Sequence, residues 1–561
     1  MNNLTAIGKF ISQLNPNNKD IGLIIDCLIN ELNLGNSCIK LSNLAKQFST
    51  DIPTLIDQLK TNDLVHVSTH GELKPKMLSL MINLADDPLL YLSRYAFYEQ
   101  QCAKYAKELS KISYPKNLNI EAKLNQLKSF SKSFPNQEQL NAIETSLYNK
   151  LSVITGGPGT GKTTTVVLIL WILITNNPNL KIKLAAPTGK AVNRLRESIN
   201  NNLTYLKDLI EDANTWFNDF LLDPNNCLTL HRLLGVINNN IYFRHNHDNP
   251  LDVDVLIIDE ASMIGLPTFY KLLDAINANK ITHLIFLGDP NQLSSVEEGY
   301  IFTSLVDSQI CKTSKLLHSN RNVTEIANFA NAILKEDIPQ IKQILSLNNP
   351  IKLNQCNLET LNNDLFTPNR ASFYQYYLAI SQLSEEFDFN LFKIFNQFKL
   401  LSPFNQGLFG VANLNQIVDK FIKQQLRTDQ NKYNGRPIMI LQNDYVNGLY
   451  NGDIGIGMYN RDGIYMVYFE NKTSYAYELL PKHTLAYAFT IHKTQGSEFD
   501  HLAIVIGNEI DKFNLISQEL IYTAVTRAKQ SINLYGEMPH LLNAIQAKSV
   551  KVSGFEYMLS C

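Results

Sequence analysis

The segment Gly156–Thr163 constrains most strongly what this chain can fold into. It reads GGPGTGKT and follows the apolar run Leu151–Ile154, where a strand would end and a helix begin. Glycines let several backbone N–H groups converge on one anion, and the helix start adds the positive end of its dipole. Lys162 supplies a cation for the β- and γ-phosphates, and Thr163 offers a hydroxyl to Mg²⁺. This context favours an ATP-binding P-loop over a glycine-rich turn with an incidental lysine.

The region from Phe134 onward alternates apolar strands with helical stretches, which is typical of a doubly wound, mostly parallel sheet. The predicted strands are Ser152–Thr155, Lys183–Ala186, Val255–Ile258 and Leu284–Leu287. A second α/β region begins near Lys315 and resumes at Ala486–Tyr535. The most apolar run, Val166–Ile174, is far too short to span a bilayer, so we expect a fully buried helix there.

The chain has 561 residues, too many for one core, so we expect several domains. Within the second α/β region, Arg436–Glu478 alternates polar and apolar residues and carries Asn-Gly and Asp-Gly turns, which predicts an inserted antiparallel barrel or meander. Lys111–Pro135 resembles a linker. The predicted domains are an N-terminal, mainly helical domain over 1–115, α/β domains over 116–312 and over 313–435 plus 479–561, and the insert over 436–478.

The N-terminal region has the outline of a winged helix. Leu41–Phe48 and Ile52–Leu59 have helical apolar spacing, Leu64–Val67 alternates, and His70-Gly71 is placed to turn a hairpin. Such folds bind DNA or hold proteins together. Because no Arg/Lys cluster marks a recognition helix, protein contact is the favoured interpretation. Tyr91–Leu109 is predicted as a further long helix.

Composition limits the classes of partner and compartment. Net charge is −2, with 50 Lys and Arg against 52 Asp and Glu, so a nucleic-acid surface would have to be local. The 7 cysteines include no Cys-x-x-Cys pair, which argues against a zinc site or a disulfide framework and for a reducing compartment. The first residues lack a signal-peptide core. We therefore expect no membrane partner and a cytoplasmic location.

Two carboxylates follow a predicted strand at Asp259 and Glu260. In a doubly wound sheet, the carboxyl ends of strands line the ligand crevice. Asp259 is then placed to hold Mg²⁺ beside Thr163, and Glu260 to orient and deprotonate the attacking water. A solvated acidic turn is the alternative for an isolated Asp-Glu pair, and the P-loop upstream disfavours it.

Four more polar residues are candidates for the nucleotide site. Gln292 follows the predicted strand Leu284–Leu287 and can sense the γ-phosphate, whereas the alternative is a plain turn. Arg321 and Arg527 are candidate arginine fingers from the second α/β domain, and surface salt bridges are the alternative. Gln139, before the first strand, can bind the adenine edge through its amide.

The order of these segments resembles the superfamily 1 helicases. The segments SVITGGPGTGKTTT, NGDIGIG, HKTQGSEFD and YTAVTRA are similar to one branch, the RecD family, which is the alpha subunit of exodeoxyribonuclease V. The resemblance covers nearly the whole chain. One departure is that Asn320 and Asn322 flank Arg321, where the family usually has aromatic residues.

The resemblance implies two RecA-like domains with ATP between them, an SH3-like inserted barrel, and 5′→3′ movement on single-stranded DNA as in superfamily 1B. It places DNA contacts at Thr188, Lys190, His231, Thr490, His492 and Lys493. It places a ribose contact at Glu498. The nucleotide-binding residues it implies around the P-loop are Gly156, Gly157, Pro158, Gly159, Thr160, Gly161, Lys162, Thr163 and Thr164.

The resemblance further implies a motor subunit that works with RecB-like and RecC-like subunits in a heterotrimer. Such a complex acts on single-stranded DNA and on double-stranded DNA with ends, in bacterial double-strand break repair and recombination. We expect ATP and Mg²⁺ as cofactors and no nuclease site in this chain. The alternatives are a stand-alone RecD-like helicase, a P-loop ATPase independent of DNA, and a scaffold whose ATPase has decayed.

Overall fold

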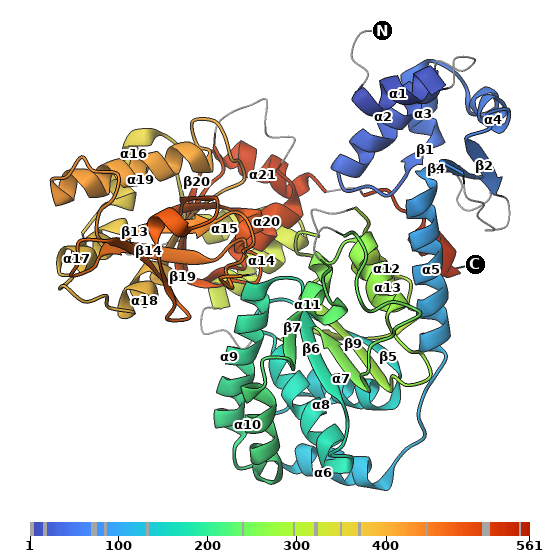
Figure 1. Ribbon diagram of the computed structural model, residues 1–561, viewed down its shortest axis with the longest axis horizontal. Helices are drawn as coiled ribbons and strands as arrows, with labels where there is room; N and C mark the ends of the chain where they lie inside the picture. Colours follow the sequence, from blue (N-terminus) through green and yellow to red (C-terminus); the bar gives the residue numbers. More distant parts are fainter. Residues whose placement is uncertain are drawn as a thin grey trace. The chain divides into compact units, whose positions relative to one another are not determined.

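The computed structural model describes most of the chain (Figure 1). The described residues are 5–14, 20–68, 76–82, 87–130, 134–237, 240–294, 298–318, 324–347, 350–368, 372–444, 446–507, 516–548 and 551–560. They form two compact units. The first comprises Met1–Pro290, Ser294–His318 and Val550–Cys561, and the second comprises Asn291–Leu293 and Ser319–Ser549.

The first unit begins with helices packed on a small sheet. The helices are α1 (Ala6–Leu14), α2 (Asp20–Asn33), α3 (Leu41–Phe48) and α4 (Ile52–Lys60). The strands are β1 (Ile39–Lys40), β2 (Val65–Ser68), β3 (Leu78–Met81) and β4 (Leu89–Leu92), in the order β1-β4-β3-β2. Apolar residues three and four apart on α2, α3 and α4 form one buried face, so the predicted helices at 41–48 and 52–59 are confirmed.

The predicted hairpin of a winged helix is wrong. Strand β2 pairs with β3 in parallel, with Val65 opposite Leu78, whereas a hairpin is antiparallel. The turn proposed at His70-Gly71 lies outside the described residues. The region also has more strand than predicted, because β4 contains the buried Tyr91, and the long helix α5 (Ser93–Ser110) begins only at Ser93.

The stretch predicted as a linker, Lys111–Pro135, contains helix α6 (Leu118–Phe130). Its residues Ile120, Leu124 and Leu127 are buried and pack on the P-loop helix α8 (Lys162–Asn176). Their spacing of four and three residues was the signal for a helix. Polar residues between them obscured that signal.

A six-stranded sheet forms the centre of the first unit. Its strands are β5 (Leu151–Gly156), β6 (Ile182–Ala186), β7 (Cys227–Thr229), β8 (Val255–Ile258), β9 (His283–Gly288) and β10 (Lys312–Leu316). Their order is β10-β5-β9-β8-β6-β7, and every neighbouring pair is parallel. The parallel sheet and all four strands predicted from the sequence are therefore confirmed.

Both faces of this sheet are covered (Figure 1), and alternate strand residues enter different cores, as the pleat requires. Val153 belongs to one core and Ile154 to the other. One core includes α5, α11 (Leu230–Leu234), α12 (Leu266–Asp274), α13 (Ile301–Asp307) and α22 (Phe555–Ser560). The other includes α6, α7 (Gln137–Tyr148), α8, α9 (Gly189–Leu206) and α10 (Asn214–Leu222). Val166–Ile174 of α8 is wholly buried, as predicted.

Two boundaries differ from the predicted ones. Strand β10 pairs with β5, with Lys312 opposite Ser152, so the first sheet extends past residue 312. Helix α22 packs on α5, and its Phe555 and Leu559 lie in the same core as Cys102. The last residues of the chain therefore belong to the first unit rather than to the second α/β domain.

The second unit has its own parallel sheet, of β11 (Ile351–Asn354), β12 (Phe398–Ser402), β18 (Ala488–Thr490), β19 (Phe499–Val505) and β20 (Ala528–Tyr535). The order is β11-β20-β19-β12-β18. One core includes α14 (Thr324–Leu334), α15 (Ile338–Ser346), α20 (Gln518–Val525) and α21 (Met538–Gln546). The other includes α16 (Leu358–Leu365), α17 (Phe373–Ser381), α18 (Asn390–Gln397) and α19 (Val411–Leu426).

An antiparallel sheet is inserted between α19 and β18, as the alternation predicted. Its strands are β13 (Arg436–Ile440), β14 (Ile454–Tyr459), β15 (Tyr465–Phe469), β16 (Ser474–Ala476) and β17 (His483–Leu485), in the order β16-β15-β14-β13-β17. The sheet extends beyond the predicted end at residue 478 because β17 pairs with β13. Closure into an SH3-like barrel stays a prediction. Among the described residues, no helix is both long and apolar enough to cross a membrane.

Candidate functional site

The P-loop joins β5 to α8, as predicted. Gly159 and Gly161 adopt positive φ angles of 78° and 86°, which glycine reaches without the steric cost that other residues meet. The Lys162 ammonium lies inside the loop and donates to the carbonyl oxygens of Gly156 at 2.5 Å and Gly157 at 3.1 Å. The loop thus places a cation among its own backbone dipoles, at the start of a buried helix.

Threonine side chains around the loop have separate tasks. Thr160 donates to the Gly157 carbonyl at 2.8 Å and closes the loop. Thr163 lies in the first turn of α8 and is partly buried. The Thr164 hydroxyl donates to the Asn202 side chain on α9 at 2.6 Å. The predicted nucleotide contact of Thr164 would therefore involve its backbone N–H, and Asn202 is a neighbour that the sequence did not reveal.

Gln139 packs directly on the loop. Its side-chain oxygen accepts from the backbone N–H of Asn136, which caps helix α7 in return. Its amide nitrogen is buried without a hydrogen-bond partner among the described residues. That nitrogen lies 2.4 Å from the position a Cβ would take at Gly161, so a side chain there would displace the Gln139 amide. A buried donor beside the phosphate loop is compatible with the predicted adenine contact, which stays a prediction.

The neighbouring Glu138 holds the end of the first unit. Its carboxylate accepts from the backbone N–H groups of Leu317 at 2.7 Å and His318 at 3.1 Å. These two residues lead toward Arg321, which lies outside the described residues, as do Asn320 and Asn322. The role of Arg321 as an arginine finger stays a prediction.

Asp259 and Glu260 follow β8 at the edge of the sheet where β5 gives way to the P-loop. Burial, followed by the adjacent Glu260 carboxylate, raises the pKa of Asp259 to about 6, while Lys162 and Arg194 oppose the shift. The effect of Lys162 places its charge within electrostatic reach of Asp259. Because burial is the larger cause, the charged form of Asp259 is disfavoured here unless a cation compensates it.

The residues at this edge suit Mg²⁺, which prefers oxygen ligands and is usually held by one or two carboxylates and hydroxyls together with phosphates. Thr163 and Asp259 supply a hydroxyl and a carboxylate. A divalent cation would also relieve the repulsion between Asp259 and Glu260, which the raised pKa of Asp259 reveals. The predicted metal ligands therefore fit this ion.

Backbone strain occurs at Glu260, which adopts φ 52° and ψ 41° in the left-handed region. A residue with a side chain is uncommon there, and such conformations cluster at functional sites. The backbone N–H of Glu260 donates to the Asp259 carboxylate at 2.9 Å. The turn thereby fixes the Asp259 carboxylate through the backbone of its neighbour.

Gln292 and Arg527 are brought together in the second unit. Arg527 is wholly buried, and one of its guanidinium nitrogens donates to the Gln292 side-chain oxygen at 2.6 Å. Its other nitrogens donate to the carbonyls of Thr523 and Ser497 at 3.2 Å. The surface salt bridge considered as the alternative for Arg527 is therefore wrong. Its catalytic role stays a prediction.

Two further residues hold the segment that carries Gln292. The Thr523 hydroxyl accepts from the backbone N–H of Leu293 at 2.8 Å, and the Gln495 amide donates to the Leu293 carbonyl at 2.8 Å. Both lie inside motifs that the sequence identified, yet no role for either residue could be inferred from the sequence. Their partner is more than 200 residues away along the chain, so no local pattern could reveal it.

The predicted DNA contacts of the first unit lie at helix starts on one edge of the sheet. Thr188 caps α9 by accepting from the Ala191 N–H at 3.2 Å, and Lys190 is exposed in the first turn. His231 is exposed in α11. Because α9 and α11 follow the neighbouring parallel strands β6 and β7, both helix starts lie at the same end of the sheet. Helix starts favour phosphate groups.

The predicted DNA contacts of the second unit follow β18. Thr490 ends this strand and is buried, whereas His492 and Lys493 are exposed on the 3₁₀ turn η4 (Ile491–Thr494). Glu498, the predicted ribose contact, is partly buried just before β19. An exposed lysine and histidine beside a buried strand end are a suitable arrangement for phosphate binding, and these roles stay predictions.

Comparisons with known proteins identify the family models and relatives that this chain matches. A family model described as an AAA domain matches residues 139–298, and one described as a UvrD-like helicase C-terminal domain matches residues 485–535. RecBCD enzyme subunit RecD of Haemophilus influenzae is 32% identical over 503 residues, covering 76% of this chain and 74% of the relative. The same subunit of Mycolicibacterium smegmatis is 32% identical over 481 residues, covering 84% and 82%. The ATP-dependent RecD2 DNA helicase of Deinococcus radiodurans is 27% identical over 400 residues, covering 70% and 48%.

We predict that Asp259→Asn stabilises the metal-free protein at neutral pH. The pKa of Asp259 is about 6 when folded, above its ordinary value, so the folded state loses stability as pH rises through 6. The variant lacks this loss. Its Tm should exceed that of the wild type by several degrees at pH 7.5 in EDTA. This difference is the one expected for a pKa shift of this size. The difference should vanish near pH 4, and an equal difference at both pH values would contradict the electrostatic cause.

We predict that Gln292 and Arg527 act as a pair in catalysis. Gln292→Ala and Arg527→Lys should each lower the ATPase kcat by roughly a hundredfold or more, because each breaks the 2.6 Å contact. The double variant should be little worse than the poorer single variant. The measurement is a double-mutant cycle on kcat, with Tm recorded for every protein. Additive losses would show that the two residues act independently.

Proposed function

The chain belongs to the RecD family of superfamily 1 helicases, and we propose that it is an ATP-dependent DNA helicase that moves 5′→3′ along single-stranded DNA. We further propose that it serves as the motor subunit of a RecBCD-type exodeoxyribonuclease V. The observation that carries the proposal is the buried contact between Arg527 and Gln292. It joins the predicted arginine finger to the predicted phosphate sensor, a pairing that a simple P-loop fold does not require.

The nucleotide chemistry is assigned to residues of the first unit and to the Gln292–Arg527 pair. The P-loop N–H groups and Lys162 would bind the phosphates, because the loop concentrates donors around one anion. Glu260 would orient the attacking water and accept its proton. Thr163 and Asp259 would hold Mg²⁺, which neutralises phosphate charge when bound. Phosphoryl transfer depends on such positioning and neutralisation more than on covalent chemistry.

Gln292 would contact the γ-phosphate and would move when this phosphate is lost. From there the hydrogen bonds of Arg527, Thr523 and Gln495 lead into the second parallel sheet. Arg527 ends the turn between α20 and β20, so a movement of Gln292 displaces groups attached to rigid elements. This gives the ATP cycle a mechanical output.

The DNA is assigned to two sets of contacts, one in each unit. Thr188, Lys190 and His231 would bind the strand on the first unit, and Thr490, His492 and Lys493 on the second. Both sets lie at strand ends or helix starts and include exposed cations. With a net charge of −2, the chain needs this local concentration of positive charge to attract DNA. Alternate grip by the two sets would give directional stepping.

The subunit role is proposed from the relatives. This chain spans 74% and 82% of the two RecBCD subunits compared but 48% of the RecD2 helicase. The 32% identity to both RecBCD subunits supports RecB-like and RecC-like partners in a heterotrimer that repairs double-strand breaks. A stand-alone helicase is the alternative. Co-purification from native extract with mass spectrometry separates them, because a stand-alone enzyme would be recovered without such subunits.

We predict that single-stranded DNA stimulates ATP hydrolysis and that the protein unwinds duplexes with a 5′ overhang but not with a 3′ overhang. Lys162→Gln should lower the stimulated rate by at least about a hundredfold with little change in Tm, because the side chain binds ligand and is not core. Glu260→Gln should still bind ATP and DNA but should no longer hydrolyse ATP. The measurements are phosphate release and strand displacement.

Three outcomes would contradict parts of this proposal. ATP hydrolysis indifferent to single-stranded DNA would favour a DNA-independent P-loop ATPase. Loss of ATP binding in Glu260→Gln would mean that this residue acts through the metal rather than the water. Shortening of linear DNA by the purified chain, with Mg²⁺ and no partner, would refute the expectation that the chain has no nuclease site.

A further inference from the structure

Helix α19 carries two buried polar residues on one face. Asn415 and Asp419 are four residues apart, so they lie on the same face of the helix, one turn from each other. Both residues are buried, with 4% and 7% of their surface exposed. Neither belongs to a segment that the sequence assigned to ATP or DNA. Burying an amide and a carboxylate is unfavourable unless both are fully hydrogen-bonded, so their partners show what they hold in place.

Asn415 holds the entrance to β18. Its side-chain oxygen accepts from the backbone N–H groups of Tyr487 at 2.8 Å and Ala488 at 3.0 Å. Its amide nitrogen donates to the Ala488 carbonyl at 3.2 Å and to the Val411 carbonyl at 3.0 Å. Since β18 is the edge strand of its sheet, the Asn415 amide takes the place of a missing neighbouring strand.

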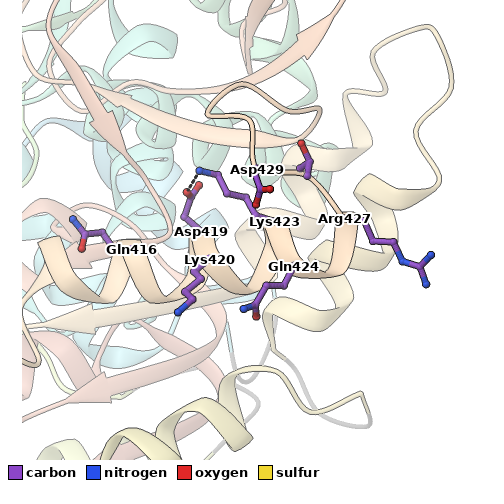
Figure 2. A pocket seen from close by; sticks show the side chains of 8 residues that line it. Gln416, Asp419, Lys420, Lys423, Gln424, Arg427 and Asp429 are labelled. Carbon is purple, nitrogen blue, oxygen red and sulfur yellow. Dashed lines mark ion pairs between the residues drawn. The ribbon is translucent and has the colours of Figure 1, made fainter.

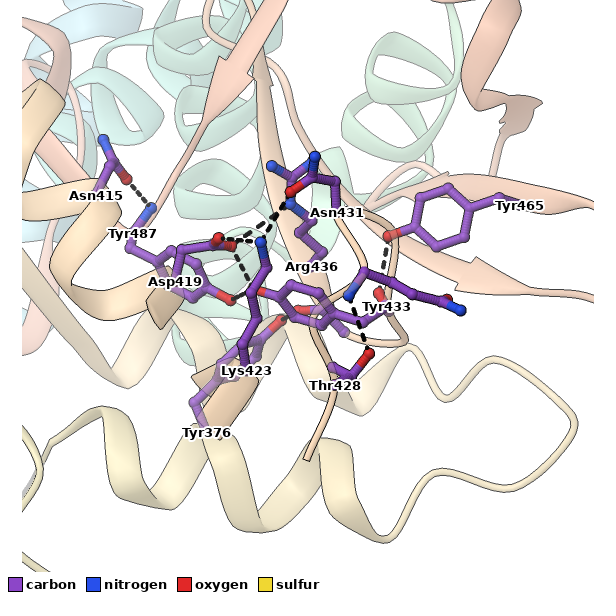
Figure 3. Close-up of polar contacts among 12 residues, drawn as sticks. Tyr376, Asn415, Asp419, Lys423, Thr428, Asn431, Tyr433, Arg436, Tyr465 and Tyr487 are labelled. Atoms are coloured by element: carbon purple, nitrogen blue, oxygen red, sulfur yellow. Dashed lines mark hydrogen bonds and ion pairs between the residues drawn. The ribbon is translucent and has the colours of Figure 1, made fainter. Parts of the chain in front are cut away.

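Asp419 holds the same junction through two tyrosines (Figure 3). Tyr433 donates its hydroxyl to the Asp419 carboxylate at 2.7 Å, and the hydroxyls of Tyr433 and Tyr487 are 2.6 Å apart. Because Tyr433 has one hydroxyl hydrogen, Tyr487 is the donor in the second bond. Tyr487 is thus held at its backbone by Asn415 and at its side chain by Tyr433.

The charge of Asp419 is balanced locally. Lys423 lies 3.1 Å and Arg436 3.5 Å from the carboxylate. Lys423 and Asp419 both line an open polar pocket of about 530 Å³ beside α19, and Figure 2 shows the ion pair between them. Removing Asp419 would leave two uncompensated cations, a large and unspecific disturbance. Asn415 and Tyr433 are therefore the better positions at which to test the junction by substitution.

The clamped junction leads directly to the proposed DNA contacts. Ala486 and Tyr487 connect β17 of the antiparallel sheet to β18 of the parallel sheet, and β18 ends at Thr490. His492 and Lys493 follow on the next turn. A strand that slips by one residue presents the opposite set of side chains, and an edge strand with three residues has few bonds of its own to prevent this.

We propose that Asn415, together with the Asp419–Tyr433–Tyr487 chain of hydrogen bonds, positions Thr490, His492 and Lys493 for DNA binding. This inference rests on the proposed function of that segment. Asn415, Asp419, Tyr433 and Tyr487 are positioning residues, because they hold the backbone and do not themselves touch DNA. The antiparallel insert is thereby linked to DNA affinity, since Tyr433 precedes β13 and Tyr487 follows β17.

The test uses the full chain with Asn415→Ala and Tyr433→Phe, two variants that release the junction at different points. Each should raise the concentration of oligo-dT that half-saturates the ATPase roughly tenfold, while the maximal rate and the KM for ATP stay within about twofold. The salt dependence of oligo-dT binding should also weaken, by about 0.7 in slope for each phosphate that the variant no longer neutralises. Tm is measured for every protein.

Tyr376→Phe is the matched control. The Tyr376 hydroxyl is buried in the same core and donates to the Gly435 carbonyl at 2.7 Å. The Tyr376 ring lies edge-on to the Tyr487 ring, with centroids 6.4 Å apart, and the Phe variant keeps this ring contact while it removes the hydroxyl. This variant should lose stability and keep the DNA dependence of the wild type. A similar DNA shift in Tyr376→Phe would show that general destabilisation explains the effect and would overturn the inference.

The remaining outcomes separate this inference from the proposed function. Wild-type ATPase that oligo-dT does not stimulate would sink the proposed function itself. Oligo-dT could instead stimulate the wild type normally, while Asn415→Ala and Tyr433→Phe need the same oligo-dT concentration as the wild type for half-saturation. That result would overturn the positioning role alone. If one variant fails to fold, the other decides by the same criterion, because both release Tyr487.

Discussion

Parallel strands buried on both faces are the constraint on which the site depends. Because β5, β9, β8 and β6 run in the same direction and in register, their carboxyl ends form one edge of the first sheet. The chain places polar residues at each of these ends and almost none along the strands. The P-loop, Asp259 and Thr188 are thereby gathered from distant parts of the sequence. The apolar helix α8, buried along Val166–Ile174, keeps that edge rigid.

This arrangement stores local instability at the nucleotide site. Burial and the neighbouring Glu260 carboxylate raise the pKa of Asp259, and Glu260 adopts a left-handed backbone conformation. Ser262 and Gln139 each bury a polar atom that has no hydrogen-bond partner among the described residues. Each feature costs stability when the protein is free, and a phosphate or a cation would relieve several of them together. Proteins commonly lose stability at sites where binding recovers it.

The sequence predicted the nucleotide edge well because its signals are local. Glycine spacing, apolar runs and the residues after each run identified the P-loop, four of the six strands of the first sheet and the carboxylate pair. It failed where structure depends on distant partners. The polar residues of helix α6 obscured its helical pattern. Strand β2 was expected in an antiparallel hairpin, but it pairs in parallel with β3. The packing of α22 on α5 has no local signature in the sequence. The partners of Arg527 and the roles of Gln495 and Asn415 likewise arise from contacts across 70 to more than 200 residues.

The segment from Tyr487 to Gln495 shows how these distant contacts combine. At its start, Asn415 and Tyr433 fix Tyr487, and at its end the Gln495 amide bonds to Leu293, next to Gln292. The proposed DNA contacts Thr490, His492 and Lys493 lie between these two anchors. One anchor is tied to a helix and the insert, and the other to Leu293, the neighbour of the residue proposed to sense phosphate. A displacement of Gln292 must then be absorbed between the anchors, because β18 cannot shift at its clamped end. Nucleotide state would therefore change the backbone at the DNA contacts, which is the coupling that a translocating motor requires.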